Sequence, residues 1–69
     1  MRKVLAFDIG GTNTRLVLIN EKFKIEKELV TSTPFGSIDA FIQNIFDMLD
    51  QFPLENVEAI SAALPGVVD

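Results

Sequence analysis

The sequence of 69 residues contains no cysteine, histidine, tryptophan or tyrosine. These absences exclude disulfides and Cys/His zinc sites, and they remove the side chain that most often acts as a general base near neutral pH. Long apolar runs are also missing, since the longest, Val4–Phe7 and Leu16–Ile19, are far too short to span a bilayer. Asp8 interrupts the apolar run behind the basic start before a signal-peptide core forms. We therefore expect a soluble, cytoplasmic chain without a membrane partner.

Positive charge is scarce as well. Six basic residues stand against ten acidic ones, for a formal net charge of −4, which argues against a nucleic-acid-binding surface. The chain is 48% hydrophobic and 23% charged, a composition typical of globular rather than disordered proteins. Its length allows one small domain at most, and such a domain buries only about 60% of the surface of its unfolded chain. The chain is thus expected to be a small domain or part of a larger one.

Three strands are predicted in the first half of the chain. Val4–Ile9 and Leu16–Ile19 are nearly continuous apolar runs, as in strands covered on both faces, and the short loop between them predicts an antiparallel hairpin. Beyond a turn at Asn20–Glu21 the pattern alternates, as in a strand near a sheet edge. One face of this third strand is expected to be apolar and the other charged: Phe23, Ile25 and Leu29 against Lys24, Glu26 and Glu28.

A helix follows the connection Thr31–Ser37, which is rich in residues that break regular structure. Ser37 is a suitable N-cap, Asp39 lies where the helix dipole favours an anion, and Pro53 ends the helix. Apolar residues at offsets of three and four predict one buried stripe: Ile38, Phe41, Ile42, Ile45, Met48, Leu49 and Phe52.

Val57–Leu64 is predicted as a fourth strand, ended by Pro65-Gly66. A helix between two strands implies a right-handed crossover and parallel pairing. The expected fold is α/β, in the order β-β-β-α-β, with a mixed sheet of strand order 3-2-1-4 and the first strand central. One helix covers one sheet face, so the opposite face needs a partner, either more of the same polypeptide or another subunit.

The segment Asp8-Ile9-Gly10-Gly11-Thr12 carries the chemistry. Glycines let a ligand approach the backbone closely, and successive N–H groups in such a turn bind anions. Thr12 offers a hydroxyl, and Asp8 is suited to hold Mg²⁺, which prefers oxygen ligands in phosphate sites. A plain hairpin turn with Asp8 as turn former explains these residues equally well. The spacing matches neither the dinucleotide fingerprint Gly-x-Gly-x-x-Gly nor the P-loop.

Two segments resemble a known family. Asp8–Leu16 (DIGGTNTRL) resembles the first phosphate motif of the actin-like ATPase superfamily, and more narrowly that of the ROK family (repressors, open reading frames and kinases). Ile60–Asp69 (ISAALPGVVD) is similar to that family's strand and loop ending in Pro-Gly-x-Val-Asp. The pair is more specific than either motif alone, and the predicted element order is the one with which the family begins.

The resemblance implies a nucleotide site at the first motif. Asp8, Gly10, Gly11 and Thr12 are expected to cradle the phosphates of ATP, with Asp8 assisting Mg²⁺ binding. Asn13 belongs to the same motif and is assigned to the same ATP site.

Two further residues of these motifs, Arg15 and Gly66, each allow two interpretations. Arg15 is either a phosphate contact or a solvated strand residue. Gly66 lies in a loop that approaches the sugar in relatives, so its backbone either touches a sugar hydroxyl or merely ends a strand. No catalytic residue is assigned within the chain, because the catalytic aspartate of the resembled kinases, their second phosphate loop and their adenosine pocket lie beyond this segment.

The resemblance predicts that residues 1–69 are a partial N-terminal domain of an ATP-dependent hexose kinase, glucokinase-like, and that the chain alone is inactive. Its partners are then a hexose, ATP and the remainder of the kinase. One alternative is a fragment of a sugar-sensing ROK-type regulator, disfavoured by the acidic composition and by a first strand that follows Met1 almost directly. Another is a non-catalytic interaction module that kept the fold.

Overall fold

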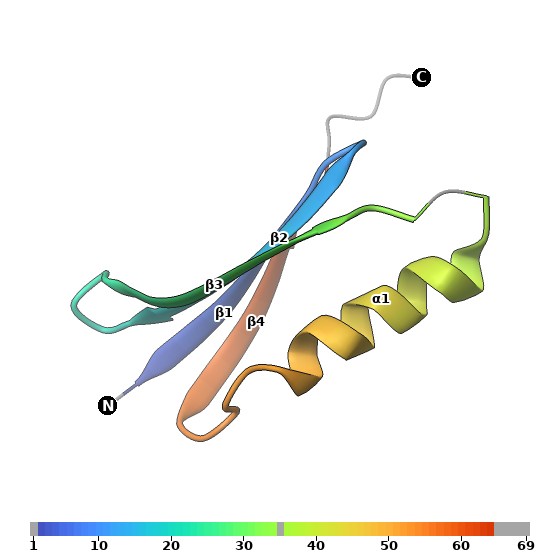
Figure 1. Cartoon of the computed structure of the whole chain (residues 1–69). Coiled ribbons are helices and arrows are strands. Elements are labelled where there is room, and N and C mark those ends of the chain that lie inside the picture. Colours follow the sequence, from blue (N-terminus) through green and yellow to red (C-terminus); the bar gives the residue numbers. More distant parts are fainter. Residues whose placement is uncertain (1, 35, 65–69) are drawn as a thin grey trace.

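The computed structural model describes residues 2–34 and 36–64, which form one sheet and one helix (Figure 1). The strands run in the order β3-β2-β1-β4, with β1 antiparallel to β2, β2 antiparallel to β3 and β1 parallel to β4. This confirms the predicted α/β fold, its strand order and its central first strand. The elements are β1 (Lys3–Ile9), β2 (Asn13–Asn20), β3 (Ile25–Ser32), α1 (Ile38–Asp50) and β4 (Val57–Ala63).

The core lies between α1 and one face of the sheet. Successive side chains of a strand point to opposite faces, so alternate residues of β1 and β2 meet the helix. The residues buried there are Leu5, Phe7, Leu16, Leu18, Met48 and Phe52.

The predicted helical stripe is buried only in part. Met48 is fully buried and Phe52 is 5% exposed, but Ile38 is 77% exposed and Ile42 45% exposed. Burial therefore increases toward the C-terminal end of the helix. The predicted N-cap is confirmed, since the Ser37 hydroxyl accepts a hydrogen bond from the Ala40 N–H at 3.2 Å.

The prediction that Phe23, Ile25 and Leu29 share one face is wrong. Phe23 lies in the β2–β3 turn with φ of 62° and is 90% exposed. A register shift between Leu18 and Ile19 then reverses the alternation, because a bulge inserts one residue into the pairing. As a result Leu29 packs on the core, whereas Ile25 lies on the face away from the helix. The strand also extends to Ser32, into the predicted connection.

The face of the sheet opposite α1 is partly apolar, and among residues 2–34 and 36–64 no element covers it (Figure 1). Val17 is buried there at 9% exposure, but Ile25 is 52% exposed and Val30 53% exposed. We call this surface the open face. In the same part of the chain no helix has the length and apolarity that crossing a bilayer requires.

Candidate functional site

The β1–β2 hairpin is closed by Gly10, Gly11 and Thr12. The Gly10 N–H donates to the Asn13 carbonyl at 2.8 Å, and a Cβ atom on Gly10 would lie 3.2 Å from that same oxygen. The close approach explains the glycine at position 10. At Gly11 a Cβ would meet no atom within 4 Å, and its φ is not in the left-handed region. The packing of the described chain therefore gives no reason for a glycine at position 11.

The loop presents unused backbone donors. Gly11 and Thr12 are exposed, and within the described ranges neither N–H has a hydrogen-bond acceptor. Unpaired N–H groups on successive residues of a turn form a concavity of positive potential, which suits an anion such as phosphate. These donors lie in the segment where the sequence predicts a phosphate-binding loop.

Thr33 fastens this loop from the end of β3, a contact that sequence analysis missed. Its hydroxyl donates to the Gly10 carbonyl at 3.0 Å, and its N–H donates to the Thr12 carbonyl at 2.9 Å. The Thr14 hydroxyl lies 2.8 Å from the Thr33 hydroxyl and is fully buried. From the sequence Thr33 falls in the predicted connection Thr31–Ser37, because the register that brings it beside the loop depends on the bulge in the β2–β3 pairing.

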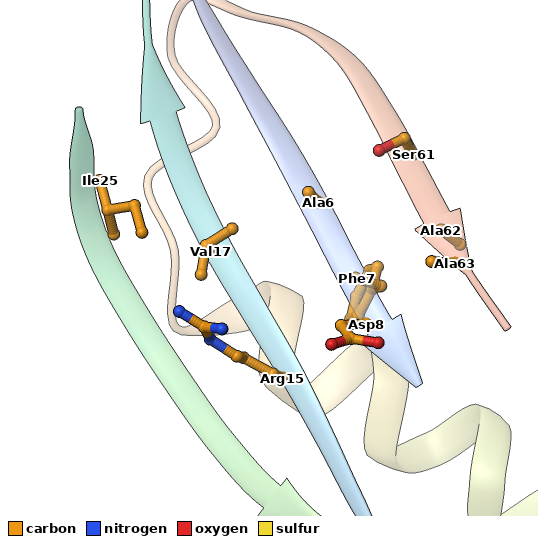
Figure 2. A pocket seen from close by; sticks show the side chains of 9 residues that line it. All are labelled: Ala6, Phe7, Asp8, Arg15, Val17, Ile25, Ser61, Ala62 and Ala63. Carbon is orange, nitrogen blue, oxygen red and sulfur yellow. The ribbon is translucent and has the colours of Figure 1, made fainter. Parts of the chain in front are cut away.

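The Asp8 carboxylate stands at the C-terminal end of β1, on the open face. It lines a hollow of about 370 Å³ whose floor is made by small side chains of β1 and β4 (Figure 2). Asp8 is exposed, and no hydrogen-bond donor of the described residues contacts its carboxylate. The carboxylate therefore keeps its coordination positions available. Its small neighbours in the hollow are Ala6, Ser61 and Ala63.

Arg15 lies opposite Asp8 in the β1–β2 register but does not turn toward it. Its side chain extends toward β3, away from Asp8 (Figure 2), and its guanidinium pairs with the carboxylate of Glu28. The structure therefore separates Arg15 from the other predicted nucleotide residues, because its guanidinium points toward β3. The others lie close together in sequence at the end of the hairpin: Asp8, Gly10, Gly11, Thr12 and Asn13.

The predicted sugar contact, Gly66, lies outside the described residues. The nearest described feature is the end of β4, where Ala63 is the parallel partner of Asp8. The carboxyl ends of β1 and β4 therefore meet at one edge of the sheet, where ligand sites of α/β folds commonly lie.

The donor set fits one kind of metal. The described residues contain no group of three or more His, Cys, Asp or Glu side chains able to hold a metal ion by themselves. Mg²⁺ is instead commonly held by one or two carboxylates together with phosphate oxygens and waters. A single accessible carboxylate, two residues before a loop with free N–H groups, fits that second arrangement.

No protein-family model matches the chain, and no curated protein matches its sequence. Solved structures do match. A proposed N-acetylmannosamine kinase from Listeria monocytogenes superposes with a TM-score of 0.73 and 24% identity, over 97% of this chain and 22% of that one. The Aquifex aeolicus member of the Ppx/GppA protein family superposes with a TM-score of 0.60 and 23% identity, over 91% of this chain and 26% of that one.

These likenesses establish the fold. The chain shares the β-β-β-α-β arrangement of these two proteins, which is the element order that the sequence predicted. It spans about a quarter of the length of each neighbour, 22% of the first and 26% of the second.

Proposed function

We propose that this chain is the N-terminal part of an ATP-dependent hexose kinase of the ROK type, glucokinase-like, and that residues 10–12 form its phosphate-binding loop. The observation that carries the proposal is Gly11. Neither its φ nor its surroundings require a glycine, whereas a phosphate resting against its N–H would require that no Cβ stand in the way. The fold of two solved proteins, one of them a proposed sugar kinase, supports the same assignment.

In this proposal the loop's own residues bind and orient the triphosphate. The N–H groups of Gly11 and Thr12 donate to phosphate oxygens, the Thr12 hydroxyl adds a further donor, and Asn13 contributes from the start of β2. Phosphoryl transfer depends chiefly on such positioning and on charge stabilisation. Arg15 is left out of the loop's contacts, because its guanidinium is already paired with Glu28.

Asp8 is the proposed Mg²⁺ ligand. The ion, when bound, supplies positive charge that offsets the charge of the phosphate oxygens. The protein's contribution is a carboxylate at the end of a central strand, unshielded by any described donor and not neutralised by the arginine opposite.

The remaining parts of the reaction are assigned to chain outside this segment. The general base, the second phosphate loop and the adenosine pocket belong there, so residues 1–69 alone are proposed to be inactive. Gly66 is proposed to meet the hexose. The rest of the kinase, or another subunit, is proposed to cover the open face, where Ile25 and Val30 are about half exposed at 52% and 53%.

The test uses the full-length protein that contains this chain. We expect Mg-ATP binding by calorimetry and hexose-dependent ADP production. Gly11→Ala should lower Mg-ATP affinity at least tenfold, about 1.4 kcal/mol, while the free energy of unfolding changes by less than about 0.5 kcal/mol. Asp8→Asn should lower the affinity for ATP in the presence of Mg²⁺ but not in its absence.

The matched control for the charge change is Glu55→Gln, an exposed carboxylate in the turn before β4, which should leave binding unchanged. Wild-type affinity in Gly11→Ala, or a full-length protein that neither binds Mg-ATP nor phosphorylates any hexose, would contradict the proposal. Mg-ATP binding without hexose phosphorylation would instead favour a nucleotide-binding module that lacks the kinase reaction.

A further inference from the structure

We propose that Thr33 is a positioning residue that aims the Gly11 N–H at the ligand, an inference that rests on the proposed role of the loop in phosphate binding. Thr33 touches the backbone on both sides of Gly11. Its hydroxyl donates to the Gly10 carbonyl at 3.0 Å, and its N–H donates to the Thr12 carbonyl at 2.9 Å. Both contacts come from a residue that follows β3, far from the loop in sequence.

The geometry of the peptide unit links the contact at the Gly10 carbonyl to the direction of the Gly11 N–H. In a trans peptide the C=O and the following N–H point in opposite directions, and the described chain has no cis peptide bond. Because the Gly10 carbonyl is held toward Thr33, the Gly11 N–H of the same peptide unit points away from Thr33. This is the N–H that lacks an acceptor among the described residues, so the donor is oriented outward before any ligand arrives.

The direction of each hydrogen bond follows from the chemistry of the groups. A carbonyl oxygen only accepts, so the single hydroxyl proton of Thr33 must go to Gly10. The Thr14 hydroxyl is therefore the donor to Thr33 across the 2.8 Å contact. Thr14 is fully buried on β2. The two successive hydrogen bonds, from Thr14 to Thr33 and from Thr33 to Gly10, therefore connect the core to the loop. Preorganised donors of this kind bind without first losing conformational freedom.

The experiment compares Thr33→Val, which keeps the shape and removes the hydroxyl, with Thr33→Ser, which keeps the hydroxyl, in the full-length protein. The matched control is Thr31→Val. It also removes a threonine hydroxyl, but one that contacts Asn44 and Met48 of α1 and not the loop. Two measurements are made on each variant: the backbone order parameter of Gly11 by NMR without ligand, and the Mg-ATP affinity by calorimetry.

We expect Thr33→Val to lower the Gly11 order parameter and to weaken Mg-ATP binding about tenfold, the equivalent of one lost hydrogen bond to an oriented group. Thr33→Ser should stay within about twofold of the wild type, and Thr31→Val should match the wild type in both measurements. A purely structural role would lower the stability of Thr33→Val without changing the affinity of the folded protein, and that result would overturn the proposal.

The two readouts separate this inference from the function on which it rests. If the wild type does not bind Mg-ATP, the proposed function fails, and the order parameter of Gly11 still decides whether Thr33 orients the loop. An unchanged Gly11 order parameter in Thr33→Val overturns the orienting role. Equal losses in Thr33→Ser and Thr33→Val also overturn it, because the hydroxyl would then not be responsible.

Discussion

Asp8 and Arg15 stand directly opposite each other on β1 and β2, yet the arginine forms its ion pair with Glu28 on β3. Residues opposite each other in an antiparallel pair have Cβ atoms about 5 Å apart, so an Asp8–Arg15 pair is within reach. Glu28 therefore pairs with the arginine that could otherwise pair with Asp8. In the resulting arrangement the guanidinium of Arg15 is not paired with the Asp8 carboxylate that lines the hollow on the open face.

Glu28→Gln should release Arg15 to compete for Asp8. We expect Mg²⁺-dependent ATP binding to weaken by up to about fivefold, since a partly exposed ion pair is worth up to about 1 kcal/mol. The double variant Glu28→Gln/Arg15→Gln should recover the affinity, because no guanidinium then remains to neutralise Asp8. The comparison is made by calorimetry at low ionic strength. Equal affinity in wild type and Glu28→Gln would show that the pairing of Arg15 does not matter to the site.

Two residues of the same predicted helical stripe should differ sharply in their effect on stability. Met48 is fully buried, and Met48→Ala should lower the free energy of unfolding by about 2–5 kcal/mol through lost burial and the cavity left behind. Ile38 is 77% exposed, and Ile38→Ala should cost less than about 1 kcal/mol. Urea unfolding followed by circular dichroism measures both. Similar losses at the two positions would mean that the first turn of α1 packs against the sheet.

Phe23 should tolerate replacement unusually well. It is 90% exposed and adopts a φ of 62°, a conformation that costs a bulky side chain about 1 kcal/mol or more and that asparagine adopts readily. Phe23→Asn should therefore raise the free energy of unfolding by about 1 kcal/mol. Phe23→Val serves as the control, because a β-branched side chain is strained in this conformation and should lower stability. A loss of stability in Phe23→Asn would show that the phenyl ring makes a contact that offsets its backbone strain.

Glu26 should make the free energy of unfolding depend on pH in the acid range. A hydrogen bond from Lys3, at 2.8 Å, and a second from Asn20, at 3.0 Å, hold the pKa of Glu26 below its ordinary value. A carboxylate with a lowered pKa in the folded state stabilises the fold above its unfolded pKa, about 4.3, and loses that contribution as the pH falls through its folded pKa.

The measurement is a pair of titrations. NMR of the glutamate carboxyl carbons should show that Lys3→Met raises the pKa of Glu26 toward its ordinary value. In urea unfolding, the stability difference between wild type and Lys3→Met should be present near neutral pH and should disappear in strong acid. A difference that stays constant across this range would exclude the ion pair as its cause.

The sequence predicted the element order and the N-cap correctly because these depend on local patterns. It also predicted the sheet order, since short turns join the antiparallel strands and a helix leads to the parallel one. The apolar runs Val4–Ile9 and Leu16–Ile19 had to be strands of the central hairpin, and Ser37 followed by the periodic segment had to begin a helix. The neighbouring residues of the Asp8–Asn13 motif also lie together whatever the register is. The fold comparison with solved structures agrees with this part of the prediction.

The face on which Ile25 lies, the partner of Arg15 and the role of Thr33 were decided only in three dimensions. All three depend on how β3 pairs with β2. Leu18 and Ile19 pair with Lys27 and Ile25, so the extra residue is Glu26 of β3, and it reverses the alternation along β3 relative to β2. Residue types and spacing determine which segments become strands and helices, since those patterns act over a few residues. Pairing register is a balance of contacts along two whole strands. This balance brings Thr33 to the loop, and it leaves Asp8 without a positive partner among the residues that the structure describes.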